Sequence, residues 1–203
     1  MTVKVDFIFD FGSPNAYFSL RVLPSILDRT GAELNLIPCL LGGIFKATGN
    51  QPPMLAFGNI KNKLDYEMLE TRRFVEKHQL NKFVFNPHFP VNTLMLMRGA
   101  IVAQQRGQLD AYVEAGLAAM WEDSLKMDDP EVYIQSMTKA GFDGAELLEA
   151  TQDASVKQKL IDNTEMAVQR GAFGIPTFFV GEEMFFGKDR LGLLEEQLVR
   201  SQP

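Results

Sequence analysis

The sequence predicts an α/β domain with a large helical insertion, and three observations support this fold class. The first forty residues read as a strand, a helix and a second strand. The middle of the chain carries helix signals and no convincing strand, and a further helix, a β-hairpin and a final helix follow it. Because the strands at the two ends need a shared sheet to bury their apolar sides, we expect one domain with an inserted helical block.

The first predicted unit runs from residue 3 to residue 41. In residues 3–11 (VKVDFIFDF), valines and phenylalanines occupy every second position, which is the period of a β-strand. Pro14 fits the first turn of a helix, because its missing N–H would have no partner there, and Gly31 is placed to end that helix. Residues 33–41 (ELNLIPCLL) read as a second strand. A strand-helix-strand unit favours a parallel pair of strands.

The predicted helical block follows a loop over residues 48–53 (TGNQPP). Asn92 and the pair Asp129-Pro130 stand where two helices are expected to begin. Asp143 has a glutamate three residues later, which is the spacing of a capping box. These signals predict several helices between the two parts of the sheet.

The C-terminal part of the sequence contains the remaining elements of the sheet. A helix is predicted from Asp153 to Arg170, and Gly171 follows it. Residues 175–180 and 184–186 read as two strands around a short turn. Asp189 is expected to cap a last helix.

Composition and charge exclude several classes of function. The formal net charge is −6 and no run of five basic residues occurs, so no nucleic-acid partner is expected. The single cysteine, Cys39, is expected to be buried and inert, and with two histidines it cannot supply the usual zinc ligands. No apolar run approaches the ~18 residues of a membrane helix, and the N-terminus lacks a signal-peptide pattern. We therefore expect a cytoplasmic protein without a metal or a membrane partner.

Two segments are candidates for chemistry from their residues alone. Ser13 lies between a buried strand and a helix start, where free N–H groups and the positive end of the helix dipole favour an anion. The same serine could serve only as an N-cap. Pro176 follows Ile175 at the start of a predicted strand, where either a cis bond or an ordinary trans proline avoids donating to the sheet.

Five segments in collinear order resemble a known family: FDFGSPNAYFS (9–19), FKATGNQPP (45–53), FNPHFPVNT (85–93), GAFGIPTFFV (171–180) and FFGKDRL (185–191). With the predicted order of elements, they resemble the DsbA-like branch of the thioredoxin fold. More narrowly, they are similar to the 2-hydroxychromene-2-carboxylate isomerases and kappa-class glutathione transferases. The resemblance implies a thioredoxin-like part over residues 1–44 and 154–203, with an inserted helical subdomain over residues 45–153. Ser13 and Ala16 stand where the DsbA-like CxxC motif has cysteines, so dithiol redox chemistry is not expected.

The resemblance also implies that glutathione is a cofactor, bound in a cleft between the thioredoxin-like part and the helical insertion. The residues that correspond to the family's glutathione site are Ser13, Ile175, Pro176, Gly187, Lys188 and Asp189. The backbone of Ile175 would pair with the extended tripeptide, and Asp189 would meet its γ-glutamyl ammonium group. Ser13 would donate a hydrogen bond to the sulfur and favour the nucleophilic thiolate.

Further candidates have structural alternatives of similar weight. The resemblance places Asn50 near the ligand, whereas its neighbours in GNQPP suit a simple turn equally well. Pro14 and Phe89 are candidates for contacting the substrate, and Phe89 is otherwise a core aromatic residue. Arg98 is a candidate for an internal ion pair. Three lysines could attract a substrate carboxylate or merely belong to solvated surfaces: Lys46, Lys61 and Lys63.

The function that the resemblance implies is a glutathione-dependent isomerase. Such an enzyme interconverts 2-hydroxychromene-2-carboxylate and trans-o-hydroxybenzylidenepyruvate by transient addition of a thiolate. A kappa-class transferase would instead release a glutathione conjugate, and a non-enzymatic glutathione- or peptide-binding module is the alternative from a different class. Because such proteins often dimerise in this family, a homodimer is expected.

Overall fold

The computed structural model describes residues 2–202 and contains a four-stranded sheet with the order β2-β1-β3-β4. Strand β1 (Lys4–Phe9) pairs in parallel with β2 (Glu33–Pro38). On its other side β1 pairs with the antiparallel strand β3 (Thr177–Val180), which pairs with β4 (Glu183–Phe186). The predicted parallel pair and the predicted hairpin are therefore confirmed.

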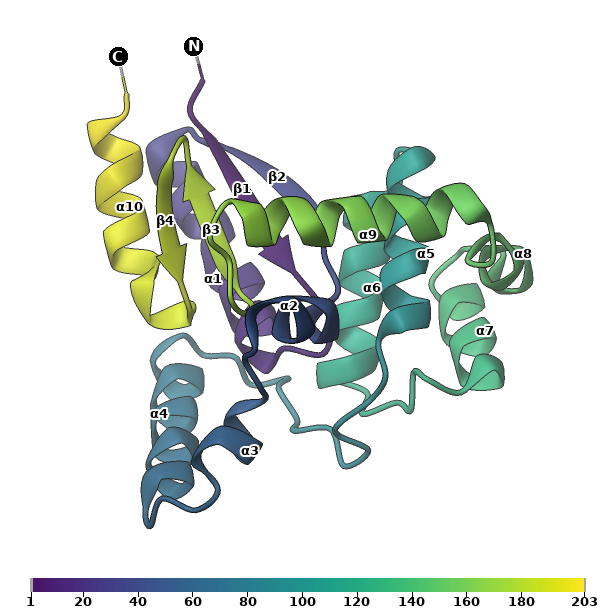
Figure 1. Ribbon diagram of the computed structural model, residues 1–203, viewed down its shortest axis with the longest axis horizontal. Coiled ribbons are helices and arrows are strands. Elements are labelled where there is room, and N and C mark those ends of the chain that lie inside the picture. The colour runs from purple at the N-terminus through teal and green to yellow at the C-terminus, as the bar shows by residue number, and fades with distance from the viewer. Residues whose placement is uncertain (1, 203) are drawn as a thin grey trace.

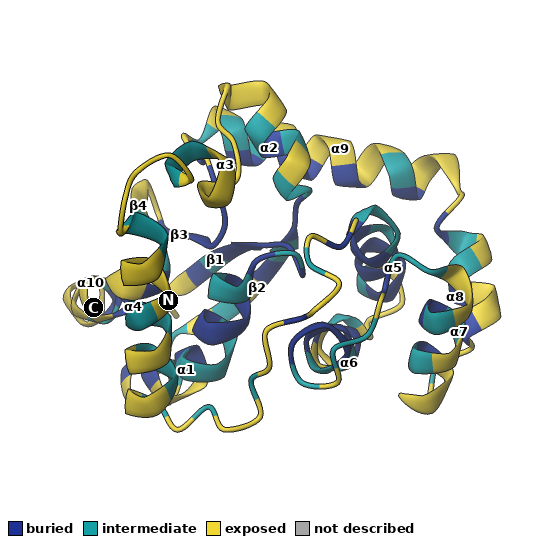
Figure 2. Cartoon of the chain, turned by 90° about the horizontal axis from the view of Figure 1, so that it is seen from below, coloured by how far each residue is buried: buried dark blue, intermediate teal, exposed yellow. Residues whose placement is uncertain are grey.

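Strand β1 is central, and its residues are more deeply buried than the alternating pattern suggests. Phe7, Ile8 and Phe9 are all fully buried. The reason is that helix α1 covers one face of the sheet and helix α9 covers the other (Figures 1 and 2). Both predicted strands also end early, because residues 10–13 turn into α1 and Leu41 already begins helix α2.

Helix α1 (Pro14–Thr30) has the bounds that the sequence predicts. Pro14 occupies its first turn and Ser13 is its N-cap. The helix ends at Gly31, which has a φ of 62°, a left-handed conformation that glycine adopts without steric strain. Two strong local signals, a capped proline start and a glycine end, therefore decide the length of this helix.

The middle of the chain is helical, as predicted. Asp129 and Asp143 each accept a backbone N–H at the start of a helix, which confirms both predicted caps. Asn92 is wrong as an N-cap by one residue: Thr93 holds that position, while the side-chain oxygen of Asn92 accepts from the Leu94 N–H. The helices are α2 (Leu41–Thr48), α3 (Pro53–Phe57), α4 (Lys63–Lys77), α5 (Leu94–Gln105), α6 (Leu109–Trp121), α7 (Pro130–Lys139) and α8 (Gly144–Ala150).

Helix α9 (Ala154–Gln169) connects the helical block to the sheet, packing against α2, α5 and β2 (Figure 1). The last helix, α10 (Leu191–Arg200), packs beside α1. Asp189 does not cap it, because residues 188–190 form a 3-10 turn and Arg190 is the N-cap residue. None of the helices within residues 2–202 combines the length and the apolarity needed to cross a membrane.

The core continues from the sheet into the helical block without a gap. Phe7 and Phe178 stack at 4.7 Å between ring centroids inside the sheet region, and Trp121 of α6 is fully buried. Cys39 is fully buried, and burial raises the pKa of its thiol. A thiol that stays protonated is a poor nucleophile, so the expectation of an inert Cys39 agrees with the structure.

We predict that Gly99→Ala destabilises the helical block. A Cβ atom on Gly99 would lie 2.1 Å from the Tyr112 hydroxyl and 2.4 Å from the Tyr133 hydroxyl. These two buried hydroxyls are hydrogen-bonded at 3.1 Å, so they cannot both move away freely. Overpacking of this kind lowers the free energy of unfolding by about 1–3 kcal/mol. Urea unfolding measures the change.

The matched control is Gly192→Ala on the exposed side of α10, where an added Cβ meets no atom within 4 Å. Removing a helical glycine there should raise the free energy of unfolding by roughly 0.5–1 kcal/mol. Equal stability of Gly99→Ala and the wild type would contradict the proposed close packing of α5.

Candidate active site

Ser13 and Ile175 lie 162 positions apart in the sequence and meet at the end of the sheet. The Ser13 hydroxyl donates to the Ile175 carbonyl oxygen at 3.1 Å and accepts from the Ala16 N–H at 3.2 Å. Ser13 is only 4% exposed, and the Ile175-Pro176 peptide bond is cis. The structure thus brings together the two segments that the sequence singles out, and Ser13 is an N-cap as well.

The N-terminus of α1 keeps an unused donor beside Ser13. Pro14 has no N–H, and the Ala16 and Tyr17 N–H groups bond to Ser13. Within residues 2–202, no acceptor pairs with the Asn15 N–H. A free N–H together with the positive end of the helix dipole makes this helix start suitable for an anionic ligand atom.

The buried carboxylate of Asp10 holds the turn that carries Ser13. One carboxylate oxygen accepts from the Gly12 N–H and the other from the Leu41 N–H, both at 2.8 Å. The Asp10 backbone carbonyl accepts from the Ser13 N–H at 3.1 Å. Burial raises the pKa of Asp10, while hydrogen bonds from Leu41, Thr93 and Gly12 oppose the increase. Sequence reasoning missed this role, although an acid between two phenylalanines at a strand end was a usable signal.

Trp121 fixes the same turn from the helical insertion. Its indole Nε1–H donates to the Phe11 carbonyl oxygen at 2.8 Å, and both residues are fully buried. The insertion therefore contributes directly to the position of Ser13. No local sequence signal pairs Trp121 with Phe11, because the two residues are 110 positions apart.

The loop over residues 187–189 lies against the cis-proline. The Gly187 N–H donates to the Pro176 carbonyl oxygen at 2.9 Å. Lys188 is buried, places its ammonium 4.8 Å from the centroid of the Phe74 ring, and donates to the Asp189 carboxylate at 2.6 Å. The Asp189 side chain is 64% exposed. The predicted GKD segment is therefore adjacent to Pro176, and its Asp189 carboxylate faces solvent.

Asn50 joins the loop after α2 to the segment that precedes the cis-proline. Its side-chain amide donates to the Phe173 carbonyl oxygen at 2.7 Å, and its side-chain oxygen accepts from the Gln51 N–H at 2.8 Å. The Asn50 N–H donates to the Phe45 carbonyl oxygen at 3.1 Å, so this residue helps to close the end of α2. Its side chain bonds to Phe173, which lies two residues before Ile175 in the sequence. The rings of Phe173 and Phe186 pack at 4.5 Å and are each 40% exposed, which leaves an apolar surface nearby.

The other predicted substrate residues lie in different surroundings. Pro14 adjoins Ser13, whereas Phe89 packs against Phe85 and Trp121 in an aromatic cluster, as the core interpretation predicts. Lys63 begins α4 and pairs with Glu67. Lys61 is exposed in the turn before α4, and Lys46 is exposed on α2. In the described part of the chain, none of these three lysines has a polar contact with Ser13, Ile175 or Asp189.

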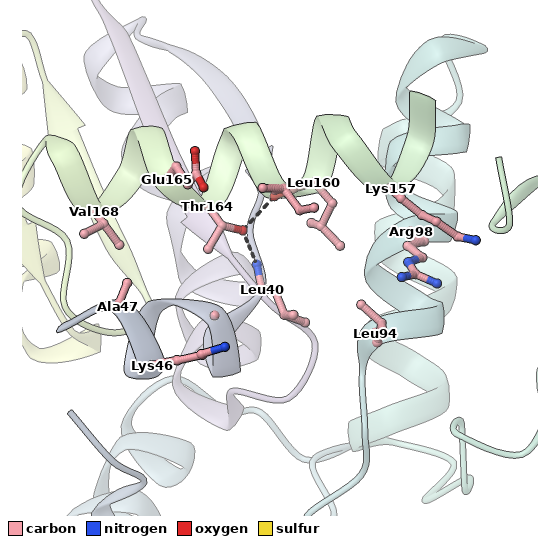
Figure 3. A pocket seen from close by; sticks show the side chains of 12 residues that line it. Leu40, Lys46, Ala47, Leu94, Arg98, Lys157, Leu160, Thr164, Glu165 and Val168 are labelled. Carbon is pink, nitrogen blue, oxygen red and sulfur yellow. Dashed lines mark hydrogen bonds between the residues drawn. The ribbon is translucent and has the colours of Figure 1, made fainter. Parts of the chain in front are cut away.

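A pocket of about 460 Å³ lies between α2, α5 and α9 (Figure 3). Lys46 and Arg98 contribute to its lining, and Ser13 does not. The internal ion pair suggested for Arg98 is wrong: among residues 2–202 no acidic side chain pairs with it, and its buried Nε has no hydrogen-bond partner. Within residues 2–202 no three His, Cys, Asp or Glu side chains gather as a metal site would require.

We predict that Asp10 gives the wild type a specific pH dependence of stability. The unfolded chain releases this proton near the ordinary pKa of 3.8, whereas the folded protein holds it to higher pH. The contribution of Asp10 to stability is therefore complete below pH 3.8 and is lost as pH rises through the raised pKa. A difference of one pH unit between the two pKa values corresponds to about 1.4 kcal/mol.

Asp10→Asn removes this titration. Because the asparagine amide has only one oxygen, its NH2 group faces one of the two backbone N–H groups from which Asp10 accepts, and the lost hydrogen bond lowers the free energy of unfolding by roughly 1–3 kcal/mol. The excess stability of the wild type over Asp10→Asn should shrink as pH rises from below 3.8, in urea unfolding measured from pH 3.5 to 7. Asp28→Asn, at an exposed position of α1, is the control and should reproduce the wild-type profile. A constant difference between wild type and Asp10→Asn would contradict the assignment.

Comparisons with known proteins extend over nearly the whole chain. A 2-hydroxychromene-2-carboxylate isomerase from Pseudomonas sp. (strain C18) is 28% identical over 195 residues, which are 96% of this chain and 90% of the relative. Glutathione S-transferase kappa 1 from Rattus norvegicus is 28% identical over 203 residues, which are 94% of this chain and 88% of the relative. The solved structure of a 2-hydroxychromene-2-carboxylate isomerase has a TM-score of 0.83 and 27% identity, covering 97% of this chain and 95% of that chain.

These similarities confirm the resemblance and the fold predicted from the sequence. The mixed sheet with its helical insertion is the thioredoxin-like arrangement of these relatives. The family model of the DSBA-like thioredoxin domain matches residues 4–199, which are most of the sequence. This chain belongs to the DSBA-like thioredoxin domain family.

Proposed function

We propose that this protein is a glutathione-dependent isomerase that interconverts 2-hydroxychromene-2-carboxylate and trans-o-hydroxybenzylidenepyruvate. The observation that carries the proposal is the Ser13 hydroxyl at the start of α1, 3.1 Å from the Ile175 carbonyl oxygen. With Ser13 and Ala16 in place of a cysteine pair, the chain has no thiol of its own at this position. In the proposed reaction the thiol therefore comes from a ligand, and the names of the relatives support the isomerase reaction.

The residues around Ser13 fit an extended tripeptide thiol. The Asn15 N–H lacks an acceptor among the described residues, so it is available to an anionic sulfur. The Ile175 carbonyl accepts from Ser13 in this structure and can accept instead from a ligand peptide N–H, as in an added strand. That exchange frees the Ser13 hydroxyl to donate toward sulfur.

The γ-glutamyl end of the tripeptide has a partner on the loop beside the cis-proline. Asp189 has one carboxylate oxygen on Lys188 and an exposed side chain, so it can accept from the γ-glutamyl ammonium group. Asn50 and Gly187 hold the backbone segments next to the cis-proline in place. Asn50, Ile175, Pro176, Gly187, Lys188 and Asp189 together with Ser13 therefore form the proposed glutathione site.

Bound glutathione supplies a thiolate that adds to the conjugated substrate and departs after rotation about the former double bond. Ser13 and the N-terminus of α1 favour the thiolate over the thiol, whose ordinary pKa is ~8.5. The same interactions lower the barrier to its departure, because they stabilise the leaving group. Pro14 borders this position. Of the three candidate lysines, Lys63 pairs with Glu67, and we assign the attraction of the substrate carboxylate to the exposed Lys61, because Lys46 lines the pocket between α2, α5 and α9.

The expected homodimer is part of the same proposal. Met54, Leu55 and Ile60 are each more than half exposed on α3 and the turn after it, and Figure 2 shows how much of this region faces solvent. Burial of such an apolar surface between two copies is favourable.

A kappa-class transferase is the second candidate, and the match to glutathione S-transferase kappa 1 favours it. It would use Ser13 and the start of α1 in the same way. The two enzymes differ in the fate of glutathione, which the transferase consumes. A non-enzymatic glutathione-binding module would use the same contacts and catalyse neither reaction.

We predict that Ser13→Ala raises the pKa of bound glutathione by about one to two pH units. Loss of one hydrogen bond to a charged group costs roughly 1.5–3 kcal/mol, and here the charged group is the thiolate. Ultraviolet titration of the thiolate in the complex measures this pKa. Ser13→Thr keeps the hydroxyl and should restore most of the wild-type value.

Ser25→Ala is the matched control, because Ser25 lies on the exposed side of the same helix. It should leave the thiolate pKa unchanged. If Ser13→Ala also left the pKa unchanged while glutathione remained bound, Ser13 would be only an N-cap.

We predict that a substoichiometric amount of glutathione supports complete isomerisation. Because the isomerase regenerates the thiol in each cycle, hydroxychromene carboxylate should reach equilibrium while the free thiol concentration stays constant. Absorbance of the substrate and a thiol assay follow both quantities. A reaction that stalls at the amount of glutathione supplied identifies the transferase, and turnover that does not depend on glutathione rejects both candidates.

A further inference from the structure

The pocket between α2, α5 and α9 is separate from the Ser13 site. Its volume of about 460 Å³ falls within the range of small-molecule sites. Leu94, Leu160 and Val168 supply apolar walls. The buried Asp10 carboxylate, bonded to the Leu41 N–H, lies between the start of α2 and the turn that carries Ser13.

Three cationic side chains from three different helices line this pocket: Lys46, Arg98 and Lys157. Figure 3 shows Lys46 and Arg98 extending toward the space between α2 and α5. Glu165 is the one acidic residue of the lining. Within residues 2–202, no ion pair involves any of the three cations. The pocket therefore combines apolar walls with an excess of unpaired positive charge.

Arg98 provides the second, independent sign of a ligand. Its Nε is buried and has no hydrogen-bond partner, which is rare because most buried polar atoms are paired. The planar edge of a guanidinium, formed by Nε and one Nη, matches the two oxygens of a carboxylate. An acceptor from outside the chain would satisfy this donor.

We propose that this pocket binds a small amphipathic carboxylate, independently of the Ser13 site. The carboxylate accepts hydrogen bonds from Arg98, and the ammonium groups of Lys46 and Lys157 add charge attraction. A ring or short hydrocarbon chain packs against Leu94 and Leu160. The apolar walls favour this class over inorganic phosphate, which would leave them in contact with water.

Isothermal titration of the full chain with 1-naphthoate tests the proposal. The wild type should bind the carboxylate at least tenfold more tightly than its neutral analogue, 1-naphthamide. Arg98→Met and Lys157→Met should each weaken binding of 1-naphthoate at least tenfold. Lys159→Met is the matched control, because this exposed lysine of α9 lies outside the pocket lining, and its affinity should equal that of the wild type.

Two further measurements separate this site from the proposed glutathione site. Ser13→Ala and saturating glutathione should both leave the affinity for 1-naphthoate unchanged, whereas Ala47→Phe, which fills the pocket, should abolish binding. Thermal unfolding checks that Arg98→Met is folded, and Lys157→Met tests the pocket without altering a buried donor. Absence of 1-naphthoate binding at millimolar concentration, equal binding of 1-naphthamide, unchanged affinity in Lys157→Met, or displacement by glutathione would each overturn the proposal.

Discussion

The carboxylate of Asp10 is the interaction on which the functional part of the molecule depends. It ends the central strand and accepts one backbone N–H from the turn into α1 and one from the start of α2. Its burial is unfavourable for a charge, and the hydrogen bonds to both oxygens reduce that cost without cancelling it, so the pKa of Asp10 stays raised. Because Ser13 lies on the first of these elements and Lys46 on the second, one side chain positions a residue of each proposed site.

The sequence predicted those features that depend on neighbouring residues. Ser13-Pro14 and Gly31 bound α1 correctly, because capping and left-handed backbone are local properties. The Ile175-Pro176 segment was also identified locally. That Ser13 and Ile175 meet followed only from the resemblance, since no periodicity relates two segments separated by most of the chain.

Features that arise from packing between distant helices could not be predicted in this way. The spacing of Arg98 on an apolar helix suggested an internal ion pair, but the pocket that Arg98 lines is completed by α2 and α9, which contribute Lys46 and Lys157. Amphipathic spacing identifies the buried side of a helix without identifying what it faces. The role of Trp121 was hidden for the same reason, and Asp189 failed as a cap because the 3-10 turn η1 (Lys188–Arg190) precedes α10.

The hydroxyl of Ser13 has a single proton, and this limits what the proposed site can activate. In the structure that proton is directed to the Ile175 carbonyl oxygen. A thiol without a peptide N–H offers Ile175 no replacement donor, so its sulfur would compete with the carbonyl for the same proton. An extended peptide thiol supplies the replacement and leaves the proton for sulfur. Recognition of the peptide backbone and stabilisation of the thiolate are therefore coupled through one hydrogen bond, which favours peptide thiols over simple ones.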